Sequence, residues 1–534
     1  MHLTTRNNLF FRLILLCALL LGCIGARLQA APAIKSVTPS PDPVGKYVKL
    51  ELTVGLAATF TNPYDPDQID LSARFTSPTK KVWNVNGFYD GAQWKIRFAA
   101  NETGTWSYTV IARDASGVTA SPAGAFTCQD SSYHGWVRVA PNKRYLCYDD
   151  GTSFYGVGAC HAWGVTTNTL DRMQALGFNT YVYWNGTYDM DGGNNLIEST
   201  ASGIGKYDQG KCARLDELID WSEARGLTMI LVILPHDYAC EDMGRWPAKW
   251  QQNPYKDIVS STNYYSDAVS WAYQKKQYRY IIARWGYSRG LSAWQTVDEI
   301  SGTSGWKVDR DTANEWAANI GAFFQTNDPF KHPTTASHGS FWDAGNKAND
   351  LPNTEIYGNY STTNIVSTIE RLWNNYTKPC IMGETGASRN GDTTHRKLWG
   401  GLAAGIAVTP LLWQFNQGWN TNMSAQYPSF LNFISDINFA GLTNPAQAKV
   451  TVTGAHAYGI TSDQMAFGWI TGDFSGKNLG LTGLANNSYR LQWFDCVAGN
   501  VISTNIVSVT NGTLTATIPA TDQSDMAYKI IAGR

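Results

Sequence analysis

The stretch Leu291-Ser-Ala-Trp-Gln-Thr-Val-Asp298-Glu299 is a short apolar run that ends in two acidic residues. A second stretch, Lys378-Pro-Cys-Ile-Met-Gly-Glu384-Thr-Gly386, has the same form. Such runs predict buried parallel strands. Most glutamates in proteins are solvated or paired, but carboxylates at the C-terminal ends of barrel strands tend to be chemical. Two converging carboxylates are what acid-assisted cleavage of a glycosidic bond requires.

Strand and helix patterns alternate on both sides of these stretches. Eight strands are predicted near residues 154–158, 178–184, 227–234, 292–298, 334–338, 355–360, 379–384 and 410–415. Predicted helices lie between most of them, at 168–176, 214–225, 312–325, 365–374 and 395–407. This α/β pattern predicts a (β/α)8 TIM barrel over residues 129–445. The alternative is an open doubly wound sheet, but no glycine-rich phosphate loop follows the first strand.

The segments that flank the barrel have the two-residue period of β-strands. In the first, Leu50, Leu52 and Val54 alternate with polar residues, which predicts an Ig-like antiparallel β-sandwich over 33–128. A second, C-terminal β-sandwich is predicted over 446–534, where Asn511-Gly512 is a strong signal for a two-residue hairpin turn.

Composition narrows the classes of partner. With 534 residues the chain exceeds what one core usually organises. A net charge of -1 gives no electrostatic case for nucleic acid or an anionic membrane. The 21 Trp and 27 Tyr suit a protein that stacks on sugar rings, although most aromatic residues fill cores.

The cysteines predict neither a metal site nor a dense disulfide framework. Nine are present, two of them near the N-terminus, and the remaining odd number contains no CxxC pair. One or two disulfides remain open. We expect no cofactor and no metal, and the sequence leaves the oligomeric state unspecified.

The N-terminus predicts export. Arg6 and Arg12 precede an apolar stretch over 13–26 and small residues at 30–31, the pattern of a secretory signal peptide over residues 1–30. The mature chain is then secreted or periplasmic and has no transmembrane segment. An alternative is the lipoprotein-like box that ends at Cys23, which would anchor the chain through a lipid.

The ends of the predicted strands supply a ring of candidate site residues. With the strands in register, one pocket is expected to collect His161, Trp184, His236, Asp298, Glu299, His338, Tyr360, Glu384 and Trp413. A single histidine after a strand is often a hydrogen-bonded structural residue, so only some of the three histidines are expected to line the site.

Three of these motifs resemble a known group of enzymes. Trp294 five residues before Glu299, Gly383-Glu384 on a later strand and Trp413 on the last strand resemble clan A retaining glycoside hydrolases. The run 94–106 is similar to the N-terminal β-sandwich that precedes such barrels. The runs 491–495 and 524–527 are similar to the collagen-binding-type C-terminal sandwich of apiosidase-like and related bacterial polysaccharide-degrading enzymes.

The resemblance implies a fold, an activity and roles for individual residues. Glu299 would be the acid/base and Glu384 the nucleophile of a double displacement on a β-linked polysaccharide or oligosaccharide. Tyr360 would hydrogen-bond Glu384, and Trp413 would form the floor under the sugar ring. The sequence departs from the family at Asp298, where the pattern has Asn. The charge of Asp298 would raise the pKa of one member of the pair.

The stretch from Pro235 to Tyr265 is long for a loop after a barrel strand and rich in aromatic residues. Such loops often build binding subsites, which favours a polymeric substrate. The alternative is that the loop packs onto a neighbouring domain. For the whole chain, the competing hypothesis is a catalytically inactive carbohydrate-binding or matrix-binding surface protein.

Overall fold

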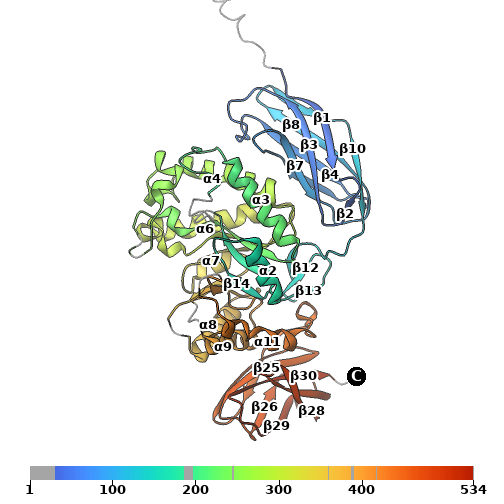
Figure 1. The fold of residues 1–534 in the computed structure, drawn as a ribbon, viewed down its shortest axis with the longest axis vertical. Coiled ribbons are helices and arrows are strands. Elements are labelled where there is room, and N and C mark those ends of the chain that lie inside the picture. The colour runs from blue at the N-terminus through green and yellow to red at the C-terminus, as the bar shows by residue number, and fades with distance from the viewer. Residues whose placement is uncertain are drawn as a thin grey trace, which may run out of the picture.

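The computed structural model describes residues 30–185, 196–242, 244, 246–358, 360–386, 390–415 and 418–532. Figure 1 shows three parts along the longest axis: N-terminal sheets at one end, a strand-and-helix body in the middle and C-terminal sheets at the other end. The predicted signal peptide and Cys23 lie outside the described residues, apart from residue 30.

The N-terminal part consists of two mostly antiparallel sheets. One has the order β1 (Ala33–Ser40), β3 (Lys49–Ala57), β7 (Trp94–Ala99), β6 (Phe88–Tyr89). The other has the order β2 (Val44–Gly45), β10 (Gly124–Gln129), β8 (Gly104–Asp114), β4 (Asp70–Thr76), β5 (Val82–Asn86), with β9 (Gly117–Ala120) paired to β8. Leu50, Leu52 and Val54 are buried between the sheets, as their alternation predicts. A small sheet of β11 (Val137–Val139), β12 (Leu146–Tyr148) and β13 (Ser153–Phe154) leads into the central part.

The central part is a barrel of eight parallel strands, which confirms the predicted fold class. In chain order they are β14 (Gly158–Cys160), β15 (Thr180–Trp184), β16 (Thr228–Leu234), β17 (Leu291–Val297), β18 (Thr334–Thr335), β19 (Asn353–Ile356), β20 (Ile381–Thr385) and β21 (Leu412–Trp413). Neighbours in the chain are neighbours in the sheet, and β14 pairs with β21. A single bridge between Thr335 and Leu351 spans the remaining gap before β19. The sixth strand ends at Ile356, four residues before the predicted end.

Helices follow most of the strands and surround the barrel. They are α2 (Thr167–Ala175), α3 (Gln209–Glu223), α4 (Ala268–Trp285), α5 (Ser304–Val308), α6 (Arg310–Asn327), α7 (Asp343–Ala348), α8 (Thr362–Asn375), α9 (Gly391–Ala404), α10 (Thr421–Ser424) and α11 (Tyr427–Ile434). No helix was predicted over α4, because its many Trp and Tyr residues obscure the alternation of polar and apolar positions that marks a helix. Its start is fixed by Asp267, whose side chain accepts the backbone N–H of Ser270 at 2.7 Å.

The aromatic stretch after β16 mostly packs inward. It forms short 3-10 turns: η1 (His236–Ala239), η2 (Trp250–Gln252), η3 (Pro254–Asp257) and η4 (Ser261–Asn263). Trp250, Tyr255 and Tyr264 are almost fully buried and contact one another edge-on. Most of this stretch therefore packs into the core of the barrel part, whereas the alternative interpretation had it packing onto a neighbouring domain.

The C-terminal part again consists of two antiparallel sheets. The larger has the order β22 (Ala446–Gln447), β24 (Ala455–Thr461), β25 (Met465–Gly472), β30 (Asp525–Ala532), β27 (Ser488–Asp495), β28 (Asn500–Ser508). The smaller has the order β23 (Lys449–Thr451), β26 (Asn478–Thr482), β29 (Thr513–Thr517). The turn residues Asn511 and Gly512 have φ values of 53° and 70°, and Thr510 bridges Thr513 across them, so the predicted two-residue turn is present. The strands on either side of the turn, β28 and β29, belong to different sheets, so the expected hairpin between them is not formed beyond this bridge.

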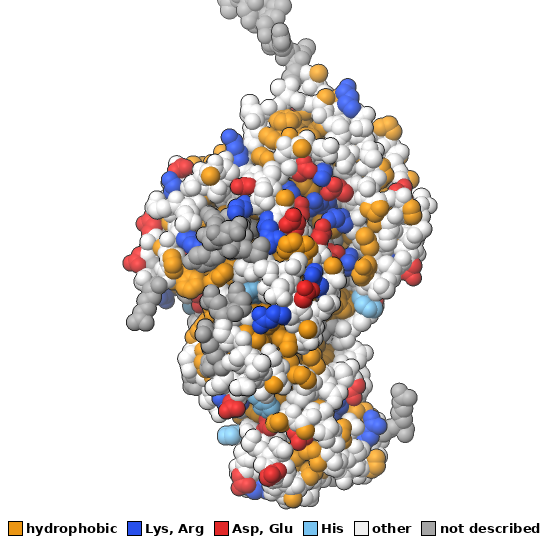
Figure 2. All heavy atoms as spheres, in the orientation of Figure 1, with side chains coloured by type: hydrophobic (Ala, Val, Ile, Leu, Met, Phe, Trp, Pro, Cys, Tyr) orange, Lys and Arg blue, Asp and Glu red, His pale blue; other side chains and the backbone are white. Residues whose placement is uncertain are grey.

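Buried ion pairs join the three parts. At the N-terminal junction, Arg97 of β7 reaches Asp216 of α3 at 2.7 Å. Figure 2 shows acidic and basic side chains mixed on the surface where the N-terminal sheets meet the barrel. At the C-terminal junction, His395 of α9 pairs with Asp525 of β30 at 2.5 Å. The indole N–H of Trp469 donates to the same carboxylate at 2.7 Å.

The cysteines from Cys128 onward are all buried and free in the structure, so neither of the disulfides left open is formed. Within the described part of the chain, every helix is too short or too polar to span a bilayer.

Candidate active site

A pocket of about 400 Å³ opens at the C-terminal ends of the barrel strands. Its walls are Trp184, His236, Trp246, Glu299, Tyr357, Glu384 and Trp413. Five of these residues were predicted from the sequence, among them both glutamates. The structure thus brings Glu299 and Glu384, which are 85 positions apart in the chain, to one pocket.

Glu299 follows β17 directly and has an unusual backbone. Its φ is 40° and its ψ is 57°, the left-handed region that residues other than glycine and asparagine rarely adopt. Its N–H donates to the Ser337 hydroxyl at 2.8 Å, which helps to hold this conformation. A strained residue is often found at a functional site, because the turn aims its side chain.

Glu384 lies within β20, and its carboxylate is buried. The hydroxyl of Tyr357 donates a short hydrogen bond to Oε1, and the thiol of Cys160 donates to Oε2 at 3.7 Å. The prediction that Tyr360 hydrogen-bonds Glu384 is therefore wrong, because the tyrosine that contacts Glu384 is Tyr357. The sixth strand ends earlier than expected, and Tyr360 instead lies beneath the ammonium group of Lys397, 4.0 Å from the ring centroid.

His236 occupies the space between two carboxylates. Its Nδ1 is 3.5 Å from Asp298 Oδ2, and its Nε2 is 3.6 Å from Glu299 Oε2. Burial alone would lower the pKa of His236, but contact with Asp298 and the charges of Asp298 and Glu299 raise it above the ordinary value. The imidazole is therefore biased toward its charged form.

Asp298 does not line the pocket. It is fully buried, and Oδ1 accepts hydrogen bonds from Gln295 at 2.7 Å and from the Ser337 hydroxyl at 3.2 Å. With His236 on its other oxygen, the carboxylate has the compensation that a buried charge needs.

Crowding shifts the carboxyl pKa values upward. For Glu299, burial raises the pKa, His236 lowers it and Asp298 raises it, with a net increase. For Glu384, burial and the charges of Asp298 and Glu299 raise the pKa, whereas Tyr357 and Cys160 oppose the shift. The pocket therefore favours retention of protons by some of its carboxyl groups at neutral pH.

Four indole rings form a cluster at the pocket. Trp184, Trp246 and Trp413 line the pocket, and Trp163 packs behind them, 5.3 Å from Trp413 and 5.7 Å from Trp184 between ring centroids. Mutual support of this kind fixes flat apolar faces beside the glutamates, a surface suited to the apolar face of a sugar ring.

Two predicted histidines lie outside the pocket. His161 is fully buried against Phe415, and burial lowers its pKa to about 4. His338 lies on the rim, where Nδ1 is 3.0 Å from the Ser340 hydroxyl and the ring packs on Trp306. Of the three histidines, only His236 lines the pocket.

Three site residues were not predicted: Trp246, Tyr357 and Glu355. Trp246 lies in the long aromatic loop, and no local pattern separates it from its buried neighbours. Glu355 lies in β19, where it is the register partner of Glu384 in β20. Asn353 and Thr354 precede Glu355 in place of an apolar run, and the predicted sixth strand began at residue 355, so nothing marked Glu355 as a residue at the end of a strand.

One group of side chains at this site has the spacing of metal ligands. Ligand atoms of His236, Asp298 and Glu299 lie within 4.8 Å of one another.

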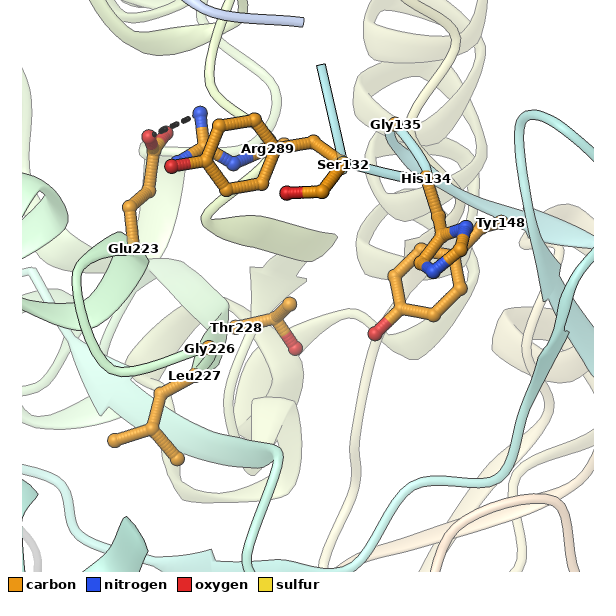
Figure 3. A pocket seen from close by; sticks show the side chains of 10 residues that line it. Ser132, His134, Gly135, Tyr148, Glu223, Gly226, Leu227, Thr228 and Arg289 are labelled. Carbon is orange, nitrogen blue, oxygen red and sulfur yellow. Dashed lines mark ion pairs between the residues drawn. The ribbon is translucent and has the colours of Figure 1, made fainter.

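A smaller pocket of about 170 Å³ lies at the opposite end of the barrel strands (Figure 3). It is bordered by Leu227 and Thr228 at the start of β16, by the segment 132–135 and by Arg289. The guanidinium of Arg289 pairs with Glu223 at 2.8 Å and packs 3.6 Å from the Tyr133 ring centroid. These contacts fix a structural junction, and neither candidate glutamate is present.

Comparison with known proteins identifies the fold. A model of a domain of unknown function, DUF5060, matches residues 43–113 within the N-terminal sheets. No curated protein matches the chain. A structure from Bacteroides vulgatus ATCC 8482, assigned as a glycoside hydrolase, is similar with a TM-score of 0.65 at 19% identity, covering 92% of this chain and 99% of that one.

Two further glycoside hydrolase structures are similar in fold to this chain. A family 5 glycoside hydrolase from the same organism has a TM-score of 0.53 at 13% identity, covering 75% of this chain and 95% of that one. Another glycoside hydrolase has a TM-score of 0.53 at 12% identity, with coverage of 75% and 97%. The chain therefore has the TIM-barrel fold, with flanking sheets, that occurs among glycoside hydrolases.

Proposed function

We propose that this protein is a retaining glycoside hydrolase that cleaves a β-linked polysaccharide or oligosaccharide. The observation that carries the proposal is the placement of Glu299 and Glu384 on one pocket, at the ends of the fourth and seventh barrel strands. The fold shared with glycoside hydrolases supports it.

In this proposal Glu384 is the nucleophile and Glu299 the acid/base. Glu384 attacks the anomeric carbon while Glu299 gives its proton to the departing oxygen. Glu299, now ionised, then takes a proton from water, and the resulting hydroxide releases the sugar from Glu384 with net retention. The raised pKa of Glu299 suits a group that must hold a proton first.

Neighbouring residues support these two roles. Tyr357 donates to Glu384 Oε1, which favours the ionised nucleophile and fixes its direction. His236 reaches Glu299, and its contact with Asp298 keeps the imidazole charged and oriented. Trp413 and Trp184 provide faces against which the sugar ring packs.

The proposal extends to the organisation of the chain. The barrel, over residues 129–445, would carry catalysis, between sandwich domains over 33–128 and 446–534. An exported protein with a signal peptide over 1–30 would meet polysaccharide outside the cytoplasm, which suits this activity.

The decisive experiment is product analysis on β-linked glucans, mannans, galactans and pectic or algal polysaccharides. The full chain is expected to release soluble sugar from at least one substrate, and the Glu384→Gln variant is expected to release none. Proton NMR during turnover is expected to show the β-anomer first. Binding of a polysaccharide without release of sugar by the unaltered chain would instead support the carbohydrate-binding alternative.

A further inference from the structure

Glu355 is a third carboxyl group beside the two glutamates of the proposed reaction. It is 5% exposed and is paired in register with Glu384 across β19 and β20. Neighbouring parallel strands are about 4.8 Å apart, so the two side chains leave the sheet side by side.

Glu355 also lies close to Glu299. A methyl group placed on Gly339 would lie 2.9 Å from Glu299 Oε1 and 3.7 Å from Glu355 Oε2. Both carboxyl groups therefore lie beside the same glycine, so Glu355 is close to the proposed acid/base as well as to the proposed nucleophile.

The other three carboxyl groups each have a partner that favours their charged form. Asp298 accepts from Gln295 and Ser337 and contacts His236, Glu384 accepts from Tyr357 and Cys160, and Glu299 contacts His236. Neither oxygen of Glu355 receives a hydrogen bond from the residues that the structure describes. The nearby Ser337 hydroxyl opposes the rise in the pKa of Glu355, but it has a single proton, which it donates to Asp298 at 3.2 Å.

The charged groups around Glu355 are mostly negative. Asp298 and Glu299 face it from the end of β17 and Glu384 from β20, whereas His236 is already held between Asp298 and Glu299. Arg371 of α8 borders an outer pocket of about 540 Å³ that Glu355 and Tyr357 also line. Burial and the charges of Glu299, Asp298 and Glu384 raise the pKa of Glu355 well above its ordinary value.

We propose that Glu355 is un-ionised at neutral pH and donates its carboxyl hydrogen to Glu299, so that it is a positioning residue for the acid/base. The inference rests on the proposed function for the role of Glu299. Like charges this close cannot all be ionised, and the proton resides on the group that has no other donor. When Glu299 is ionised in the covalent intermediate, the same hydrogen bond stabilises its charge, and the proton stays on Glu355.

Infrared spectroscopy of the full chain at pH 7 tests the protonation state without a substrate. Replacing Glu355 by Gln is expected to remove a carbonyl-stretch band of an un-ionised carboxylic acid. Glu315→Gln on α6 is the matched control. Because Glu315 is exposed, this variant is expected to lose only carboxylate absorption. Loss of carboxylate absorption from Glu355→Gln as well would overturn the proposal, whether or not the protein is an enzyme.

The pH profile of kcat/KM tests the action on Glu299. Glu355→Gln keeps a neutral donor, so the basic limb is expected to stay in place. Glu355→Leu removes the donor and is expected to move the basic limb upward by about one pH unit, because the ionised form of Glu299 loses a hydrogen bond. A downward shift in Glu355→Gln would show that a negative charge had been removed and would contradict the proposal. An unmoved limb in Glu355→Leu would contradict the hydrogen bond.

Discussion

His236 and Asp298 form a buried pair directly behind the candidate acid/base, with Nδ1 3.5 Å from Oδ2. The other ring nitrogen of His236 is 3.6 Å from Glu299 Oε2. Asp298, the acidic residue at which the sequence departs from the pattern that it resembles, therefore contacts a histidine from another strand end. Asp298 acts on Glu299 partly through that histidine.

Replacing His236 by Gln is expected to raise the pKa of Glu299. The charge of His236 lowers that pKa and the charge of Asp298 raises it, so the variant loses the opposing effect and leaves Asp298 uncompensated. The basic limb of the kcat/KM profile should move to higher pH. Adding Asp298→Asn to this variant should move the limb back down, because only a negative charge is then removed. An unmoved limb in His236→Gln would show that His236 is neutral in the free protein.

Glutamine variants of the two glutamates separate their roles. Glu384→Gln should abolish turnover of every substrate, since no nucleophile remains. Glu299→Gln should lose about 10² to 10⁴ in rate on polysaccharide but keep fast release from aryl glycosides with activated leaving groups, which need no proton. The burst of aryl release in the first turnover decides the matter, because the second step still needs Glu299 as the base that activates water. Loss of this burst in Glu299→Gln, as in Glu384→Gln, would contradict the assignment.

Tyr357→Phe should lower kcat by about 10- to 100-fold, the effect of losing one hydrogen bond to a charged group. The bond to Glu384 Oε1 is the contact removed. Tyr360→Phe is the matched control, since its ring contacts Lys397 rather than Glu384. A loss in the control as large as in Tyr357→Phe would restore the assignment made from sequence.

The junction with the C-terminal sheets should depend on pH. Burial lowers the pKa of His395, but the hydrogen bond and charge of Asp525 raise it above 6.5 overall. Stability from a raised histidine pKa is fully present below the unfolded value of about 6.5 and is lost as pH rises through the folded value. Asp525→Asn should therefore cost about 1.5–3 kcal/mol at pH 6 and less at pH 9.

Calorimetric unfolding of the unaltered chain and of the Asp525→Asn variant at pH 6 and pH 9 measures the difference in their free energies of unfolding. Asparagine keeps an acceptor for the Trp469 indole, so the change isolates the charge. A cost that does not vary with pH would show that His395 is neutral in the folded protein.

The order of strands and helices was readable from sequence because burial leaves a local record. The runs that became β16 and β17 are apolar throughout, as strands covered on both faces must be. Helix α4 was missed because aromatic residues fill the positions where polar residues would show the period. The sixth strand was placed too far along the chain, since Tyr357 and Tyr360 both fit a strand end and only pairing with β20 separates them.

The sequence by itself determined the barrel, the flanking sheets and the two glutamates, because each depends on a short pattern that burial or strand period imposes locally. Only the tertiary structure decided which residues meet at the pocket. The contacts of His236 with Asp298 and Glu299, of Tyr357 with Glu384, and of Glu355 beside both glutamates join residues tens of positions apart. Such contacts depend on strand register, where a shift of one residue turns a side chain to the other face of the sheet, and no local pattern in the chain records it.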